Sequence, residues 1–159
     1  MTLNDEVLAS MACSNAYCNN AQIVIVPKSK ENLSTEELKN LTFAVESGSA
    51  GQAAAEENGF EFVPVLSQAD AVMEVASGTS DAAIIDSLMA AAMVGEGTGY
   101  PDLTYTVSLT EEQYGVGFRK GSSLAERLNE FFKAAYADGT LLSTAEKYGV
   151  QAAVLKQEA

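Results

Sequence analysis

One stretch decides the fold: residues 41–57, LTFAVESGSAGQAAAEE. The apolar run Phe43-Ala44-Val45 is typical of a strand buried inside a parallel sheet. Gly48 and Gly51 permit a tight turn and close backbone approach, and Ser47 and Ser49 place hydroxyls beside the unpaired N–H groups that begin a helix. Because a helix N-terminus is partly positive, this turn suits a carboxylate or a phosphate. The alternative is an ordinary strand–helix turn that binds nothing.

Strand and helix patterns alternate on both sides of this stretch. Strands are predicted at 22–26, 60–65, 81–85 and 103–107, and Pro64 indicates an edge strand. Helices are predicted at 34–40, with a Ser34–Glu37 capping box, from Ser67 to Gly78, and at 87–94. This alternation from residue 22 to 107 predicts an α/β fold with a mostly parallel central sheet.

Asp86 follows the predicted strand 81–85 directly. In sheets of this kind, ligands lie beyond the carboxyl ends of the strands, where the Ser47–Gly51 turn also falls. We therefore expect a binding site that combines this turn with Asp86. A simple helix N-cap is the alternative role for Asp86, as it is for Ser49.

The composition excludes several classes of function. The 159 residues include nine basic and 22 acidic side chains, for a net charge of −13, which disfavours nucleic acid or an anionic membrane as a partner. The chain has no histidine, so Ser-His-Asp, Cys-His and HExxH chemistry are excluded. We expect no metal and no cofactor.

The two cysteines and the N-terminus give weaker signals. Cys13 and Cys18 lie five residues apart, which leaves free thiols or a local disulfide open. No segment approaches the length of a transmembrane helix, and the first residues lack a basic and apolar leader, so no signal peptide is expected in this chain.

Several motifs, in order, resemble a known family: the type II extracytoplasmic (periplasmic) solute-binding proteins of amino-acid ABC transporters. Each motif is weak alone, but together they cover nearly the whole chain. They are Met1–Glu6, Ser14–Tyr17, Phe43–Ser49, Gly78–Asp86, Tyr114–Ser122, Gly139–Leu141 and Lys147–Gly149.

The resemblance implies a domain organisation and a truncation. Residues 28–112 would be a complete second lobe with three layers around its sheet. Residues 1–27 would be a remnant of the first lobe with one crossover strand, and 113–159 would supply the return crossover strand and the C-terminal helices of that lobe. The family motif that begins at Met1 normally lies well inside the first lobe, so the chain would be an N-terminally truncated form.

The resemblance also implies ligand-binding roles. Thr2 would contact the ligand amino group from lobe one, and the loop Ser47, Gly48, Ser49 and Ala50 would bind the ligand carboxylate. Asp86 would pair with the ligand ammonium. A disordered terminus is the alternative for Thr2. The family's carboxylate-binding arginine is replaced here by Val7, which removes its bidentate ion pair.

These features predict a non-enzymatic binding component of an ABC importer for polar amino acids, working outside the cytoplasmic membrane with a permease. The C-terminal helix carries an apolar stripe, Leu124, Leu128, Phe131 and Phe132, that would lack its usual cover. A dimer or domain-swapped oligomer is therefore expected. The alternatives are a non-binding remnant that dimerises through these helices and a dehydratase-like enzyme on the same fold.

Overall fold

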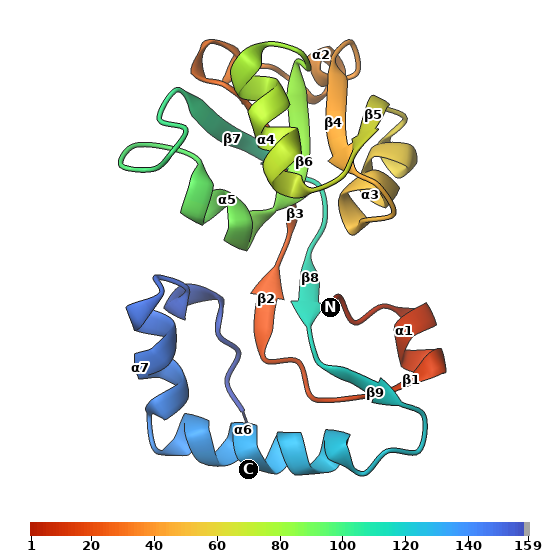
Figure 1. Cartoon of the computed structure of the whole chain (residues 1–159), viewed down its shortest axis with the longest axis vertical. Helices are drawn as coiled ribbons and strands as arrows, with labels where there is room; N and C mark the ends of the chain where they lie inside the picture. The colour runs from red at the N-terminus through yellow and green to blue at the C-terminus, as the bar shows by residue number, and fades with distance from the viewer. Residues whose placement is uncertain (158–159) are drawn as a thin grey trace. The chain divides into compact units, whose positions relative to one another are not determined.

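A computed structural model describes residues 1–157 of the chain (Figure 1). The chain divides into two units. Unit 1 comprises Met1–Asn20 and the residues from Glu112 onward, and unit 2 comprises Ala21–Glu111. Each unit is described separately below.

Unit 2 is built on a five-stranded sheet in the order β5-β4-β6-β3-β7. The strands are β3 (Gln22–Pro27), β4 (Thr42–Glu46), β5 (Glu61–Val65), β6 (Ala82–Asp86) and β7 (Leu103–Ser108). Strands β5, β4 and β6 are parallel, while β3 runs antiparallel to both β6 and β7. Four strands therefore share one direction, and the expected mostly parallel sheet is mixed because β3 opposes them.

Helices connect the strands of unit 2. They are η1 (Lys28–Lys30), α2 (Thr35–Leu38), α3 (Ala50–Asn58), α4 (Gln68–Ser77) and α5 (Ser87–Met93). The predicted capping box is present, since Ser34 and Glu37 each accept a hydrogen bond from the backbone of the other. The helix α3 ends at Gly59, whose φ of +69° is a left-handed conformation that favours glycine.

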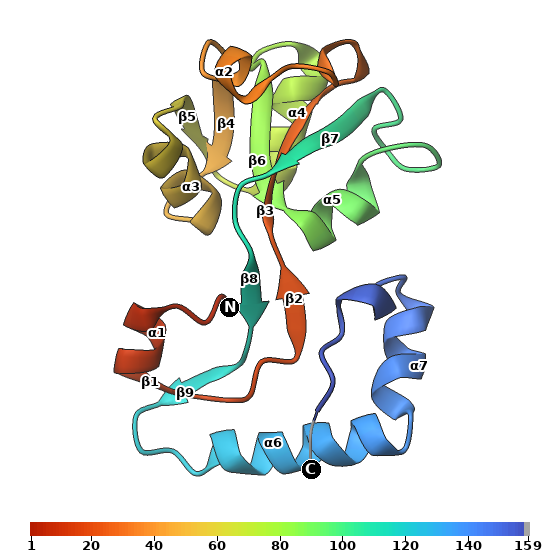
Figure 2. The same ribbon diagram turned by 180° about the vertical axis from the view of Figure 1, so that it is seen from behind.

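Two apolar clusters sandwich the sheet and make unit 2 three layers thick. Side chains alternate along β3, so Ile23 and Ile25 belong to one cluster and Val24 and Val26 to the other. The first cluster includes Val72 of α4 and Ala90 of α5, and α4 crosses in front of β6 in Figure 1 and behind it in Figure 2. The second cluster includes residues of α2 and α3, with Phe43 and Phe60 stacked at 4.5 Å between ring centroids.

Unit 1 contains two short antiparallel ladders and its own helices. Strand β1 (Met11–Cys13) pairs with β9 (Gly117–Arg119), and β2 (Cys18–Asn20) pairs with β8 (Glu112–Tyr114). The helices are α1 (Asp5–Ser10), α6 (Leu124–Ala137), α7 (Thr140–Lys147) and η2 (Gln151–Ala153). The sequence predicted one return crossover strand after residue 112, and the structure has two short strands there. The predicted strand is split into β8 and β9 because each half pairs with a different strand.

The apolar stripe of α6 is only partly covered within unit 1. Phe132 is buried and its ring lies 5.3 Å from that of Tyr17, measured between centroids. Phe131 is 60% exposed and Leu124 is 49% exposed. Both cysteines are free thiols, so the local disulfide left open by the sequence is not formed. Within residues 1–157, no helix is long and apolar enough to cross a membrane.

Candidate functional site

The turn between β4 and α3 presents backbone donors at one edge of the unit 2 sheet. Ser47 N–H donates to the Val65 carbonyl at 3.0 Å, which ties the turn to β5. Gly48 has a φ of +74°, and its N–H donates to Gln52 Oε1 at 2.9 Å. Ser49 caps α3, because its Oγ accepts a hydrogen bond from Gln52 N–H at 3.2 Å. The capping role that the sequence offered for Ser49 is therefore real, and the hydroxyl proton can still be donated to a ligand.

The first two backbone N–H groups of α3, those of Ala50 and Gly51, are available to a ligand. The N–H groups of a first helical turn have no intrahelical acceptor. Among residues 1–157, those of Ala50 and Gly51 donate no hydrogen bond to the chain. The turn thus offers two backbone donors and one hydroxyl where the helix dipole is positive.

Gly51 sets the distance between α3 and the sheet. A Cβ at this position would lie 2.9 Å from the Ile84 carbonyl oxygen of β6 and 3.2 Å from Gln22 Oε1. Only a glycine permits so close an approach without a shift of backbone. The close contact places the N-terminus of α3 against the carboxyl end of β6, two residues before Asp86.

Asp86 is the last residue of β6, and its carboxylate is oriented by two glutamines. Gln22 Nε2 donates to one carboxylate oxygen at 2.7 Å, and Gln68 Nε2 donates to the other at 2.7 Å. Asp86 occupies the N-cap position of α5 but makes no side-chain capping bond. The simple N-cap role therefore does not apply, and the carboxylate is held toward β3 and α4 instead.

The sequence interpretation missed Gln22 and Gln68. Gln22 is 1% exposed, faces Asp86 across the β3–β6 ladder and donates to its carboxylate. Its Oε1 also faces Gly51, since a Cβ on that glycine would lie 3.2 Å from it. Gln68 begins α4, and its Oε1 also accepts from Asp86 N–H at 2.9 Å. For Gln22, the available signal was a side-chain amide at the first position of an otherwise apolar strand. For Gln68, the only signal was its position directly after the N-cap residue Ser67.

Thr2 belongs to unit 1, whereas the other predicted site residues belong to unit 2. It forms an isolated β-bridge with Tyr114, and its hydroxyl donates to Glu112 Oε2 at 3.1 Å. Val7, at the position of the family's arginine, lies in α1 and donates its N–H to the Asn4 side chain. The structure thus brings Ser47, Gly48, Ser49, Ala50 and Asp86 to one edge of unit 2 and leaves the proposed role of Thr2 as a prediction.

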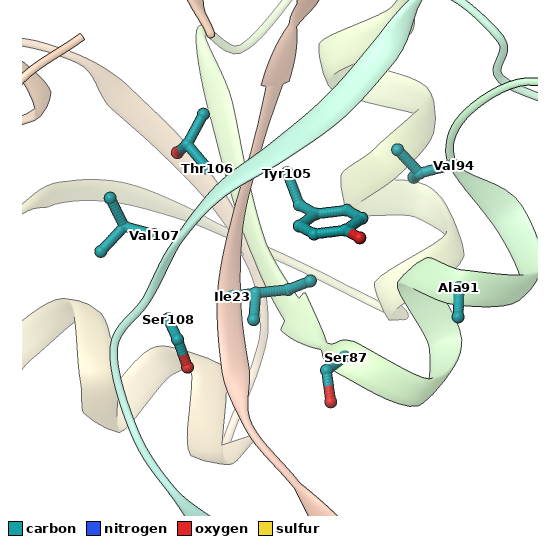
Figure 3. Close-up of a pocket in the computed structure, with 8 residues that line it drawn as sticks. All are labelled: Ile23, Ser87, Ala91, Val94, Tyr105, Thr106, Val107 and Ser108. Carbon is teal, nitrogen blue, oxygen red and sulfur yellow. The ribbon is translucent and has the colours of Figure 1, made fainter. Parts of the chain in front are cut away.

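A separate cavity of about 490 Å³ lies in unit 2 between β3, β7 and α5 (Figure 3). Its lining contains no charged side chain and none of the predicted site residues. The buried hydroxyl of Thr106 has no hydrogen-bond partner among residues 1–157, but Figure 3 shows it across β7 from the Tyr105 ring. No group of acidic or cysteine side chains among residues 1–157 could hold a metal ion.

Comparisons with known proteins agree with this architecture. No family model matches the chain, and no curated protein matches it. Among solved structures, a mutant of ArgBP from T. maritima superposes with a TM-score of 0.80 at 27% identity, over 93% of this chain and 66% of that one. The ancestral amino acid-binding protein AncCDT-1, a precursor of cyclohexadienyl dehydratase, gives 0.80 at 28% identity, with the same 93% and 66% coverage. ArtJ, an arginine-, lysine- and histidine-binding protein from Geobacillus stearothermophilus, gives 0.81 at 24% identity over 93% and 66%.

The chain therefore has the fold of the amino-acid solute-binding proteins of the type II periplasmic class, and unit 2 has the architecture of one lobe of that class. It spans 66% of the length of the structures quoted above.

Proposed function

We propose that this chain is the substrate-binding component of an ABC importer for polar amino acids and that it binds a free α-amino acid without transforming it. The observation that carries this proposal is that a donor-rich helix N-terminus and Asp86 lie at one sheet edge, with the Gln22 side chain beside both. An α-amino acid carries one anion and one cation on the same carbon. The N-terminus of α3 can bind the carboxylate of such a ligand, and Asp86 can bind its ammonium group.

The carboxylate is bound by the turn. The amides of Ala50 and Gly51 and the hydroxyl of Ser49 donate to its oxygens, while Ser47 and Gly48 hold the turn in shape through their bonds to Val65 and Gln52. Because these donors are fixed by β4 and α3 before the ligand arrives, little entropy is lost in ordering them.

The ammonium is bound by Asp86. Gln22 and Gln68 each donate one hydrogen bond to a carboxylate oxygen, and an ionised carboxylate can accept about four hydrogen bonds in all. A charge-assisted bond from the ligand to this pre-oriented carboxylate is stronger than a neutral one.

The partners and location follow from the same proposal. The chain works outside the cytoplasmic membrane and delivers its ligand to a membrane permease. Residues 28–112 act as the second lobe of a binding protein, and residues 1–27 and 113–159 contribute the crossover strands and part of the first lobe. Several of the neighbouring structures hold a bound amino acid, arginine in two of them and glutamate in a third, which supports an amino acid as the ligand class.

One observation favours a second candidate, a remnant that dimerises through α6 and binds nothing. Phe131 and Leu124 leave an apolar surface on that helix. A dehydratase-like enzyme has less support, since the chain has no histidine to serve as acid or base, although one neighbour is a precursor of such an enzyme.

A thermal-shift screen with polar L-amino acids tests the proposal. We expect at least one to raise the melting temperature of the wild-type chain, and Ser49→Ala to reduce that rise because it removes a donor to the carboxylate. The absence of a shift with every amino acid would contradict ligand binding and favour the dimerising remnant.

A further inference from the structure

The charge of the chain is concentrated in unit 2. Residues 21–111 contain three lysines, no arginine and 14 acidic side chains, a net formal charge of 3 minus 14, or −11, out of −13 for the whole chain. The candidate site therefore lies on the strongly negative part of the molecule. A ligand approaching it moves in that field.

All three lysines lie at the sheet edge opposite the candidate site. Lys28 and Lys30 follow the end of β3, which is antiparallel to β6, and Lys39 precedes the start of β4. Each also lies close to a carboxylate. Lys30 contacts Asp81 at 2.6 Å, Lys39 contacts Glu36 at 3.0 Å, and Lys28 lies 4.0 Å from Glu96.

Acidic side chains occupy the edge of the candidate site. Glu46 ends β4, Asp86 ends β6, Asp70 lies in the first turn of α4, and Glu111 follows β7. No basic side chain of unit 2 lies at this edge, because the three lysines are at the other one. In the proposed function the N-terminus of α3 binds the ligand α-carboxylate, and no lysine or arginine of unit 2 lies at this edge to pair with a second anion.

We propose that the ligand bound at this edge is an α-amino acid with a cationic side chain. This inference rests on the proposed function and narrows it. The α-carboxylate meets the amides of α3 and the α-ammonium meets Asp86, while the side-chain cation lies in the field of Glu46 and its acidic neighbours. An anionic side chain meets like charge there and is rejected.

Calorimetric titration of the full chain with L-arginine, L-glutamine and L-glutamate tests the inference. At low ionic strength, we expect L-arginine to bind about tenfold more tightly than L-glutamine, and L-glutamate to bind most weakly. Raising the salt concentration to about 0.5 M should weaken L-arginine binding several-fold and leave L-glutamine nearly unchanged.

Two matched variants test whether Glu46 contributes to the preference for L-arginine. Glu46→Gln should weaken L-arginine about two- to threefold without changing L-glutamine. Glu57→Gln, an exposed site near the far end of α3, should change neither. If L-glutamate binds as tightly as L-arginine, or if the preference for L-arginine is independent of salt and of Glu46, this inference is wrong while amino-acid binding stands. If none of the three probes binds the folded chain, the inference and the proposed function fail together.

Discussion

Gln68 makes two hydrogen bonds to Asp86 with a single side chain. Its Nε2 donates to the Asp86 carboxylate at 2.7 Å, and its Oε1 accepts from the Asp86 backbone N–H at 2.9 Å. The first residue of α4 therefore fixes both the rotamer of Asp86 and the end of β6. In the proposed function, Gln68 is a positioning residue for the ligand ammonium.

Replacing Gln68 with methionine should loosen Asp86. The side chain keeps its length but loses both bonds, so we expect amino-acid affinity to fall about tenfold, in line with about 1.5–3 kcal/mol for a hydrogen bond to a charged group. Calorimetric titration measures the loss. The control Gln151→Met changes an exposed residue of η2 and should bind like wild type. Equal affinities for the two variants would remove Gln68 from the site.

Gly51→Ala tests the close approach of α3 to β6. The added methyl would lie 2.9 Å from the Ile84 carbonyl oxygen, so the helix must shift, and we expect a loss of about 1–3 kcal/mol in the free energy of unfolding. Gly99→Ala is the matched control, because its Cβ meets nothing within 4 Å and its φ is not positive. It should stay within about 0.5 kcal/mol of wild type. Denaturant unfolding distinguishes them, and equal stabilities would show that the approach has room for a side chain.

Asp81 should make the stability of unit 2 sensitive to acid. Hydrogen bonds from the Lys30 ammonium and the Thr42 N–H hold the pKa of Asp81 below its usual range. A pKa lowered by folding contributes stability that is present above the unfolded-state pKa, about 3.9, and is lost as the pH falls through the folded-state pKa.

We therefore expect Asp81→Asn to cost about 1 kcal/mol at pH 7, with the gap to wild type closing below about pH 4. Urea unfolding at a series of pH values measures it. Glu36→Gln, in an exposed pair with Lys39, should show almost no cost at any pH. A constant gap for Asp81→Asn down to pH 2.5 would rule out titration as its cause.

Phe131 tests association through α6. We expect the wild-type chain to form dimers because this ring and Leu124 leave an apolar surface, and we expect Phe131→Ser to shift the chain toward monomer. Light scattering across concentrations reports the mass. Leu66→Ser is the control, since Leu66 is 92% exposed but lies in unit 2. A wild-type chain that remains monomeric at high concentration would count against the dimer.

Local sequence signals predicted much of the fold correctly. The Ser34–Glu37 capping box and the end of the helix at Gly78 depend on neighbouring residues, and Pro64 correctly indicated an edge strand because it cannot donate to a ladder. The direction of β3 depends on pairing with strands about 60 and 80 residues away, so periodicity alone could not give it.

The site was predicted only in part for the same reason. Backbone features such as the Ser47–Gly51 turn and the position of Asp86 at a strand end follow from element boundaries. The roles of Gln22 and Gln68 depend on side-chain directions across β3, β6 and α4, which one-dimensional patterns do not contain.

Isothermal titration of wild type and Asp86→Asn with a panel of polar L-amino acids tests the central claim most directly. Removing the charge of Asp86 while keeping its shape takes away the partner of the ligand ammonium. We predict saturable one-to-one binding of at least one amino acid to wild type, weakened at least tenfold in Asp86→Asn, with Asp81→Asn binding like wild type. Saturable binding that Asp86→Asn leaves unchanged, or no binding by the folded wild-type chain, would contradict the account.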